Sequence, residues 1–319
     1  MSGIKSTSDI NKYQPLVSIV TASYNRGNYI EDTIKSVILQ DYPNIEYIVV
    51  DGGSTDNTID ILKRYEGRLR WISEKDEGTE DAINKGLNIA RGEIFGWLNS
   101  DDTYLPGAIT KIVIFLNESP EVKMVYGKGY FTDLYGNRIG NYPTEPFNLK
   151  RLAISNYICH PAAFVRKDAF REVGGYSLNL RHATDHDLWI RIAQRYKVAY
   201  LPELLATFRI HEYSKSIFEE SILKGYRESL QLVMKYFNWA PASRVFTYCY
   251  HLIKSKMPAR IARIRPIVLF ITFIMALEEY LRLNKGIRLD DFRFIKLKDI
   301  KKLFAGWDLQ DVIEKGVTL

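Results

Sequence analysis

Residues 16–39 read LVSIVTASYNRGNYIEDTIKSVIL, and this stretch decides how the first half of the chain folds. It begins with a short segment of apolar and β-branched residues over 16–22. A turn sequence, Asn25-Arg26-Gly27, follows, and an amphipathic segment runs over 29–39. This order predicts a β-strand, a turn and an α-helix.

The same order recurs as far as residue 98. We expect further strands over 45–50, 69–73 and 94–98, and helices over 58–65 and about 79–90. Strands that alternate with helices at this spacing form right-handed βαβ units. The predicted fold is therefore an α/β, Rossmann-like, mainly parallel sheet with helices on both faces, in which ligands bind beyond the carboxyl ends of the strands.

The pattern changes after residue 102. Short strands over 122–126, 130–132, 198–200 and 206–210, with a polar turn at 135–137, predict an antiparallel or mixed second half. A helix is expected over 187–195, and the residues after 213 have mostly helical patterns. The sequence contains no internal repeat.

The composition is that of a globular protein in a reducing compartment. The 319 residues include 44 Lys+Arg, 38 Asp+Glu and only two cysteines, too few for a disulfide framework or, alone, a zinc site. The first residues lack the apolar core of a signal peptide. The longest uncharged apolar run of the C-terminal part, 266–277, is shorter than the roughly 20 residues that span a bilayer. We expect a cytoplasmic protein.

Positive charge is concentrated in the last third of the chain. Residues 1–211 carry 25 basic and 26 acidic side chains, whereas residues 212–319 carry 19 and 12. Five basic residues come before the apolar run: Lys254, Lys256, Arg260, Arg263 and Arg265. Such a segment suits peripheral contact with an anionic membrane on its inner face. The alternative is a helical hairpin packed on the rest of the chain. Because no aromatic residues are interleaved, a nucleic-acid partner is not expected. No oligomeric state is indicated.

Two adjacent carboxylates, Asp101 and Asp102, follow the predicted strand over 94–98. They repel each other unless a cation or hydrogen-bond donors compensate them, and hard divalent ions prefer such oxygen ligands. The alternative interpretation is that Asp102 caps a helix that runs to Leu116.

Three further motifs carry chemistry. In Asp51-Gly52-Gly53-Ser54 the glycines let backbone approach a ligand and Asp51 accepts hydrogen bonds, although a plain turn looks similar. Asp185 stands at the start of an amphipathic helix, as a general base or as a partner of the helix dipole. Arg209 and His211 are expected on one strand face, where they suit a phosphate clamp and a metal ligand.

In their order along the chain, these segments resemble the family 2 glycosyltransferases over roughly residues 15–213. The motifs are VSIVTASYN at 17–25, DGGSTDNT at 51–58, NKG at 84–86, ARG at 90–92, NSDD at 99–102, GGY at 174–176, DHDLW at 185–189 and RIH at 209–211. The resemblance implies a GT-A fold over 15–213, with a nucleotide-binding half (about 15–102) and an acceptor half (about 103–213). An N-terminal extension (1–14) and a helical, basic C-terminal region (214–319) flank it.

The resemblance also implies the reaction: metal-dependent hexosyl transfer with inversion, using Mn²⁺ or Mg²⁺. We expect a UDP-linked sugar donor and a hydroxyl of a glycan or lipid-linked acceptor, in surface polysaccharide or glycoconjugate synthesis. The alternative is a catalytically silent nucleotide-sugar-binding protein of the same fold. The chain retains Asp101 and Asp102 of the metal loop, and it also retains Asp185 and His211. This favours the enzyme.

The roles of single residues follow from the resemblance. Nucleotide and donor contacts are implied for Thr21, Ala22, Tyr24, Asp51, Asp76, Asn84, Asp101 and Arg209. Asp102 is implied as the direct metal ligand, which His211 joins, and Asp185 as the general base. The chain departs from the family pattern at two positions, where Thr184 replaces a Glu and Asn99 replaces an Asp.

Overall fold

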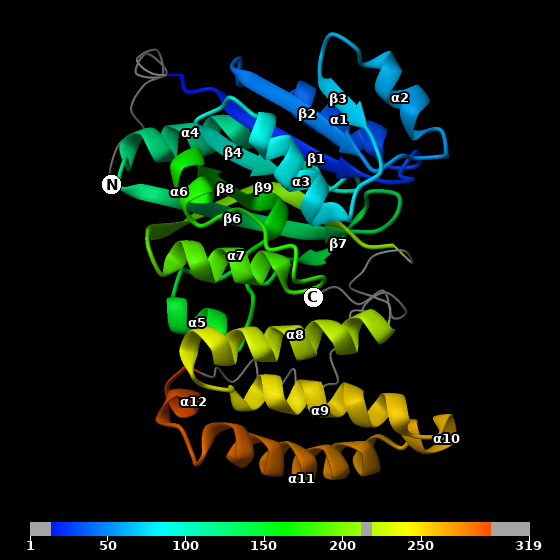
Figure 1. Cartoon of the computed structure of the whole chain (residues 1–319), viewed down its shortest axis with the longest axis vertical. Helices are drawn as coiled ribbons and strands as arrows, with labels where there is room; N and C mark the ends of the chain where they lie inside the picture. The colour runs from blue at the N-terminus through cyan, green and yellow to red at the C-terminus, as the bar shows by residue number, and fades with distance from the viewer. Residues whose placement is uncertain (1–13, 212–218, 295–319) are drawn as a thin grey trace. The chain divides into compact units, whose positions relative to one another are not determined.

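The computed structural model describes residues 14–211 and 219–294, which form two compact units (Figure 1). The first unit comprises the described residues up to Phe147, together with Tyr157–Leu178 and Arg191–Ile210. The second comprises Asn148–Asn156, Asn179–Ile190 and the described residues from His211 onward. Apart from Gln14, the predicted N-terminal extension lies outside the described residues, as does the predicted boundary at 213.

The first unit is built on one nine-stranded sheet, and the predicted α/β fold is confirmed. Its parallel part has the order β3-β2-β1-β4, with bounds β1 Val17–Ser23, β2 Ile45–Asp51, β3 Arg70–Ser73 and β4 Ile94–Trp97. The sheet continues β8-β6-β9-β5, with β7 paired to β6. The bounds are β5 Thr103–Tyr104, β6 Val122–Thr132, β7 Arg138–Asn141, β8 Ala163–Arg166 and β9 Lys197–Arg209. Because β8 is antiparallel to both neighbours and β9 is parallel to β6, the second half is mixed, as expected.

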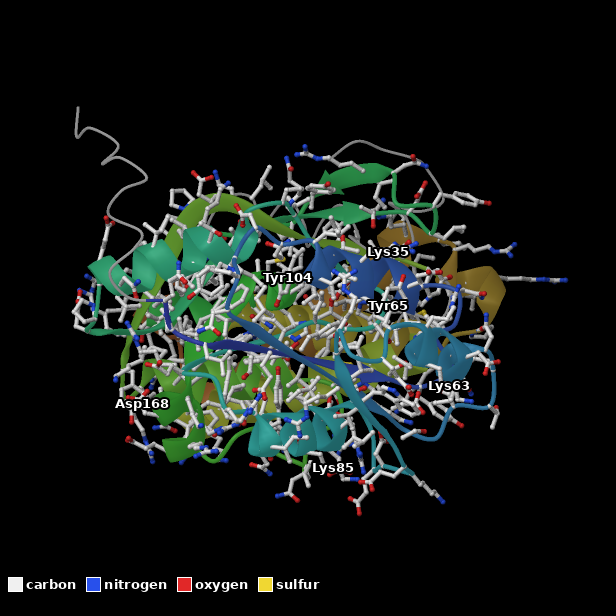
Figure 2. The ribbon with its side chains drawn as sticks, turned by 90° about the horizontal axis from the view of Figure 1, so that it is seen from above. Lys35, Lys63, Tyr65, Lys85, Tyr104 and Asp168 are labelled. Atoms are coloured by element: carbon white, nitrogen blue, oxygen red, sulfur yellow. The ribbon has the colours of Figure 1, made fainter. Side chains whose placement is uncertain are left out.

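Helices complete the first unit: α1 Ile30–Ile38, α2 Thr58–Arg64, α3 Thr79–Ile89, α4 Ala108–Glu118, α6 Lys167–Glu172 and the short 3₁₀ helix η2 His160–Ala162. Every residue of β1 is buried, which explains its apolar run without alternation, since a central strand is covered on both faces. α3 packs closely on β1 at Gly86, where an added Cβ would lie 2.4 Å from Val20 Cγ1. Tyr104, labelled in Figure 2, is only 3% exposed and stacks on Phe164 with ring centroids 5.5 Å apart.

Two pairs of predicted short strands are each a single strand. The predicted strands over 198–200 and 206–210 merge into β9 despite Pro202 between them. The pairing register shifts there, so that Tyr126 faces Tyr200 but Lys128 faces Leu204. Such an irregularity accommodates a proline, because regular pairing is already interrupted there and the missing N–H of proline removes no hydrogen bond between the strands. The predicted strands over 122–126 and 130–132 likewise form the continuous β6.

The second unit is helical, as predicted for the described residues after 213. It holds α5 Leu149–Ile154, α8 Glu219–Phe237, α9 Ala242–Lys256, α10 Ala259–Ala262, α11 Arg265–Asn284 and α12 Leu289–Phe294. Helix α7, Thr184–Ala193, begins in this unit three residues earlier than predicted. Figure 1 shows α8, α9 and α11 side by side, and their shared core contains Leu230, Ala240, Val245, Cys249, Ala276 and Tyr280. Among the described helices, none has the length and apolar character needed to cross a bilayer.

Candidate active site

The loops after β1 and β2 are tied together at the carboxyl edge of the parallel sheet. Ser23 and Asp51 end these strands in direct register. Beyond them, the Asn25 side-chain oxygen accepts the Thr55 N–H at 2.9 Å, and Ser54 Oγ accepts the Asn25 N–H at 2.8 Å. The edge where a doubly wound sheet binds ligands is therefore a braced pair of loops.

Three of the predicted nucleotide contacts lie at the end of β1. Thr21 is fully buried, with Oγ1 3.1 Å from the hydroxyl of Tyr47, and Ala22 is 8% exposed. Tyr24 is 58% exposed. Of these three, Tyr24 has the side chain most available to a ligand, while Thr21 and Ala22 lie beneath the surface.

Asp51 organises the turn that follows β2. It is fully buried, and its Oδ2 accepts bonds from the Gly53 N–H (3.0 Å), the Ser54 N–H (2.8 Å) and Ser73 Oγ (2.7 Å). Asp76 lies directly against this turn, since a Cβ at Gly52 would be 2.7 Å from Asp76 Oδ2. The structure thus brings Asp51 and Asp76 to the same turn, and a side chain at position 52 would require the Asp76 carboxylate to move.

Asn84 joins two segments that are distant in sequence. Its Nδ2 donates to the carbonyl of Tyr176 at 2.9 Å, and its Oδ1 accepts the Tyr176 N–H at 3.0 Å. Gly175, with φ +65°, closes on the same amide, because an added Cβ would lie 2.8 Å from Asn84 Oδ1. The NKG and GGY motifs therefore meet through this side chain.

Asp102 is buried, and both of its carboxylate oxygens have hydrogen-bond partners. It is 1% exposed, its Oδ1 accepts the Arg209 N–H at 2.9 Å, and its Oδ2 lies 3.3 Å from Asn99 Nδ2. The interpretation of Asp102 as a helix cap is wrong. The chain enters β5 directly after it, and α4 begins only at Ala108, behind Gly107 in the left-handed conformation at φ 75°.

The environment of Asp102 suits a cation. Burial, and then the charge of the adjacent Asp101, raise the pKa of Asp102 well above its usual range. Among the described residues, no three His, Cys, Asp or Glu side chains cluster to hold a metal alone. Mg²⁺ in phosphate-transfer sites is commonly held by one or two carboxylates plus substrate phosphates. The donor set at Asp101 and Asp102 fits a metal shared with a diphosphate.

The predicted phosphate clamp, Arg209, is already engaged. Its Nη2 lies 2.9 Å from Asp32 Oδ2 on α1, and its Cζ lies 5.1 Å from the ring centroid of Tyr29. The residue is 6% exposed. Its guanidinium is thus held in one orientation by α1, next to the strand end that binds Asp102.

The prediction that Arg209 and His211 share a strand face is wrong. β9 ends at Arg209, whose partner Thr132 is the last residue of β6. The Ile210 N–H still donates to the Thr132 carbonyl at 2.8 Å, but β6 offers no residue beyond it to pair with His211. His211 is 4% exposed and belongs to the second unit.

Asp185 also belongs to the second unit, in the first turn of α7. It is half-buried, whereas its neighbours His186 and Asp187 are 2% and 3% exposed. Asp187 accepts a 2.9 Å hydrogen bond from the hydroxyl of Tyr236, and His186 Nε2 lies 2.8 Å from the Leu152 carbonyl. Of the two carboxylates in this turn, Asp185 is therefore the one more open to an acceptor.

Two supporting residues are absent from the sequence-based prediction. Asp32 pairs with Arg209 across 177 residues of sequence, and Glu228 on α8 binds the segment in front of α7. An acidic residue in the first turn of α1 is a common helix feature and gives no hint of the pairing. Glu228 lies in a segment that matches none of the family motifs.

Comparisons with known proteins agree on the family. The family model described as Glycosyl transferase family 2 matches residues 18–174. An uncharacterized glycosyltransferase of Mycobacterium tuberculosis is 33% identical over 183 residues, 56% of this chain and 69% of that protein. One of Rickettsia typhi is 29% identical over 210 residues, 63% of this chain. The chain covers 66% of the length of that relative, and 36% of the length of a Rickettsia felis relative.

Two solved structures share the fold. Staphylococcus aureus TarS 1–349 in complex with UDP-GlcNAc is 17% identical, with a TM-score of 0.58 over 85% of this chain and 90% of that one. The mannosyltransferase PcManGT from Pyrobaculum calidifontis, in complex with GDP-Man and Mn²⁺, is also 17% identical, with a TM-score of 0.56 over 86% and 87%. Together with the ordered motifs and the sheet they occupy, these similarities show that the chain belongs to glycosyltransferase family 2 and has its GT-A fold.

Proposed function

We propose that this protein is an inverting glycosyltransferase that moves a hexose from a UDP-linked donor to a hydroxyl group of a glycan or lipid-linked acceptor. The observation that carries the proposal is the buried Asp102 beside Asp101 at the end of β4, an arrangement that is costly unless a cation offsets it. TarS, with UDP-GlcNAc, and PcManGT, with GDP-Man and Mn²⁺, support donors of this class.

The carboxyl edge of the sheet is the proposed donor site. Tyr24 offers an exposed ring on which a nucleobase can stack. In this proposal Asp51 and Asp76 shape the glycine turn that approaches the ribose. Thr21 and Ala22 line the buried end of β1, and Asn84, which binds the Tyr176 backbone, is a further donor contact. In this proposal Asp101 contacts the ribose or the sugar, and Arg209 faces the diphosphate.

A divalent metal, Mn²⁺ or Mg²⁺, belongs to the proposal, with Asp102 and His211 as its ligands. When bound, it would neutralise the charge of the diphosphate leaving group. Asp185 takes the proton of the acceptor hydroxyl, which attacks the anomeric carbon opposite the departing diphosphate. That single displacement inverts the anomeric configuration and needs no covalent intermediate.

A screen of nucleotide sugars tests the proposal. The intact protein is incubated with UDP-linked hexoses and with GDP-mannose, each in Mn²⁺, in Mg²⁺ and in excess chelator. The measured quantity is the release of nucleoside diphosphate. We expect release from one UDP-linked sugar that depends on the metal. Binding of a donor without turnover, with acceptor glycans present, would favour the catalytically silent alternative.

We also propose that α11 brings the enzyme to an anionic membrane, where lipid-linked acceptors lie. Its inward residues Val268, Thr272, Ala276 and Tyr280 are buried, but its other side exposes a continuous apolar strip. The strip consists of Ile267, Phe270, Ile271, Phe273, Ile274 and Leu277, each 37–68% exposed. Arg260, Arg263 and Arg265 are exposed just ahead of it, and residues 254–277 include no acid. A lipid surface satisfies both features, since each basic residue contributes about 1 kcal/mol near anionic lipid.

Sedimentation with vesicles tests this contact. The intact protein should sediment with phosphatidylglycerol–phosphatidylcholine vesicles at low salt, and less with phosphatidylcholine alone. Phe270→Ser with Phe273→Ser should remain in the supernatant. Leu39→Ser, at a residue 72% exposed in the first unit, is the matched control and should sediment normally. If the double variant sediments like the control, or changes only the oligomeric state, the strip is not a membrane surface.

A further inference from the structure

We propose that Glu228 is a positioning residue for the general base, so that α8 forms part of the catalytic machinery. The inference rests on the proposed role of Asp185. Both residues belong to the second unit, and so does each contact that carries the argument.

Glu228 binds three consecutive backbone amides ahead of α7. Its Oε2 accepts the N–H groups of His182 at 2.8 Å, Ala183 at 3.1 Å and Arg181 at 3.2 Å. α7 starts at the next residue, Thr184. Amides at a helix start have no partner within the helix, and a carboxylate there also interacts favourably with the helix dipole. One side chain of α8 therefore fixes where the helix that carries Asp185 begins.

The same face of α8 holds the residues on the other side of Asp185. Three residues before Glu228, a Cβ added at Gly225 would lie 3.3 Å from His182 Cβ, so α8 approaches this segment closely. Ser229 Oγ lies 3.4 Å from His186 Nδ1, and the Tyr236 hydroxyl donates to Asp187 at 2.9 Å. Asp185 is thus flanked on both sides by backbone or side chains that α8 binds.

Arg244 of α9 completes this hold. Its Nη2 donates to the Leu152 carbonyl at 3.1 Å and lies 3.5 Å from His186 Nε2, and its Nη1 donates to Ser229. Hydrogen bonds to a charged group, such as those of Arg244 and Glu228, are about twice as strong as neutral ones.

Removal of the three bonds that Glu228 accepts would let the first turn of α7 shift. A displacement of about 1 Å at a reacting group can cost about a hundredfold in rate.

The test compares Glu228→Ala and Glu228→Gln in the intact protein with Glu278→Gln, which alters an exposed glutamate of α11. We expect Glu228→Ala to lower kcat by roughly ten- to a hundredfold. The KM for the donor should stay within about twofold, because the loss concerns orientation and not donor binding. Glu228→Gln should recover part of kcat, since its amide oxygen still accepts N–H bonds. An unchanged kcat in Glu228→Ala, or an equal loss in Glu278→Gln, would overturn the inference.

A double variant separates positioning from general damage to the fold. If Glu228 acts through Asp185, then Asp185→Asn with Glu228→Ala should be no slower than Asp185→Asn alone. A further loss of tenfold or more in the double variant would show a role that does not pass through the base. Full activity in Asp185→Asn would overturn the assignment of the base itself, whereas full activity only in Glu228→Ala would overturn the positioning role and leave the base in place.

Discussion

The backbone N–H of Arg209 donates a 2.9 Å hydrogen bond to Oδ1 of Asp102, which joins the last residue of β9 to the loop after β4. The same arginine binds Asp32 on α1 through its guanidinium. Asp102, which follows β4 of the parallel half of the sheet, is therefore held by β9 of the mixed half. The end of β9 is thus in direct contact with the proposed metal ligand.

Asp102→Asn should abolish transfer while leaving the fold intact. The amide oxygen can still accept the Arg209 N–H, and a buried charge is removed, so we expect an unchanged or higher Tm. We expect metal-dependent transfer to fall at least about a hundredfold, because electrostatic stabilisation of the leaving group is lost. Asp60→Asn, at a side chain 80% exposed on α2, is the control and should keep full activity. Full activity of Asp102→Asn, or of the wild type in excess chelator, would contradict the metal assignment.

The two carboxylates of α7 should respond differently to the same substitution. Asp185→Asn is expected to bind donor normally and lose transfer by at least roughly a hundredfold, the usual effect of removing a positioned base. Asp187→Asn perturbs the bond from Tyr236, so we expect a loss of stability of about 1 kcal/mol with activity retained. The measurements are kcat, donor affinity and Tm for each variant. The reverse pattern would make Asp187 the base.

The order of elements in the first half could be predicted because each strand and helix carries its own periodicity. Apolar runs predict the strands β1 and β2, and apolar residues spaced three and four apart predict the helix α1. Both signals are local and do not depend on the rest of the chain. The continuity of β9 could not be predicted in this way. Pro202 is a local signal to stop, and it is tolerated only because the register with β6 shifts at that point.

The site divides along the same line. The motifs make Asp102 and Asp185 candidates, since these carboxylates stand at strand and helix ends that local pattern predicts. Their partners could not be predicted: Asp32 is 177 residues from Arg209, and Glu228 is 46 residues from His182. Contacts across such separations arise from packing, and a single sequence carries no periodic signal for them. The same reason accounts for His211: β9 ends at Arg209 because its neighbour β6 ends at Thr132, so His211 lies outside the strand.

Tyr24→Ala should weaken donor binding without destabilising the fold. Base stacking on an aromatic ring contributes about 1–3 kcal/mol, so we expect the donor Kd to rise roughly tenfold. Because Tyr24 is 58% exposed, Tm should hardly change. Tyr135→Ala, at a tyrosine 81% exposed elsewhere in the first unit, is the matched control and should leave Kd unchanged. Calorimetric titration with UDP measures both, and an equal Kd in the two variants would remove Tyr24 from the donor site.

His186 should make the second unit sensitive to mild acid. Burial, and then the positive charge of Arg244, lower the pKa of His186 well below its usual range. In the unfolded chain the imidazole takes up a proton near pH 6.5, which the folded state resists. The stabilisation by the neutral ring is therefore present above about pH 6.5 and is lost as the pH falls below it.

His186→Gln keeps a donor for the Leu152 carbonyl but does not titrate. We expect the wild type to have the higher Tm at pH 8 and this advantage to shrink by pH 5, whereas His182→Gln, at a half-buried histidine, should follow the wild type throughout. A Tm difference between wild type and His186→Gln that stays constant from pH 8 to pH 5 would contradict the prediction.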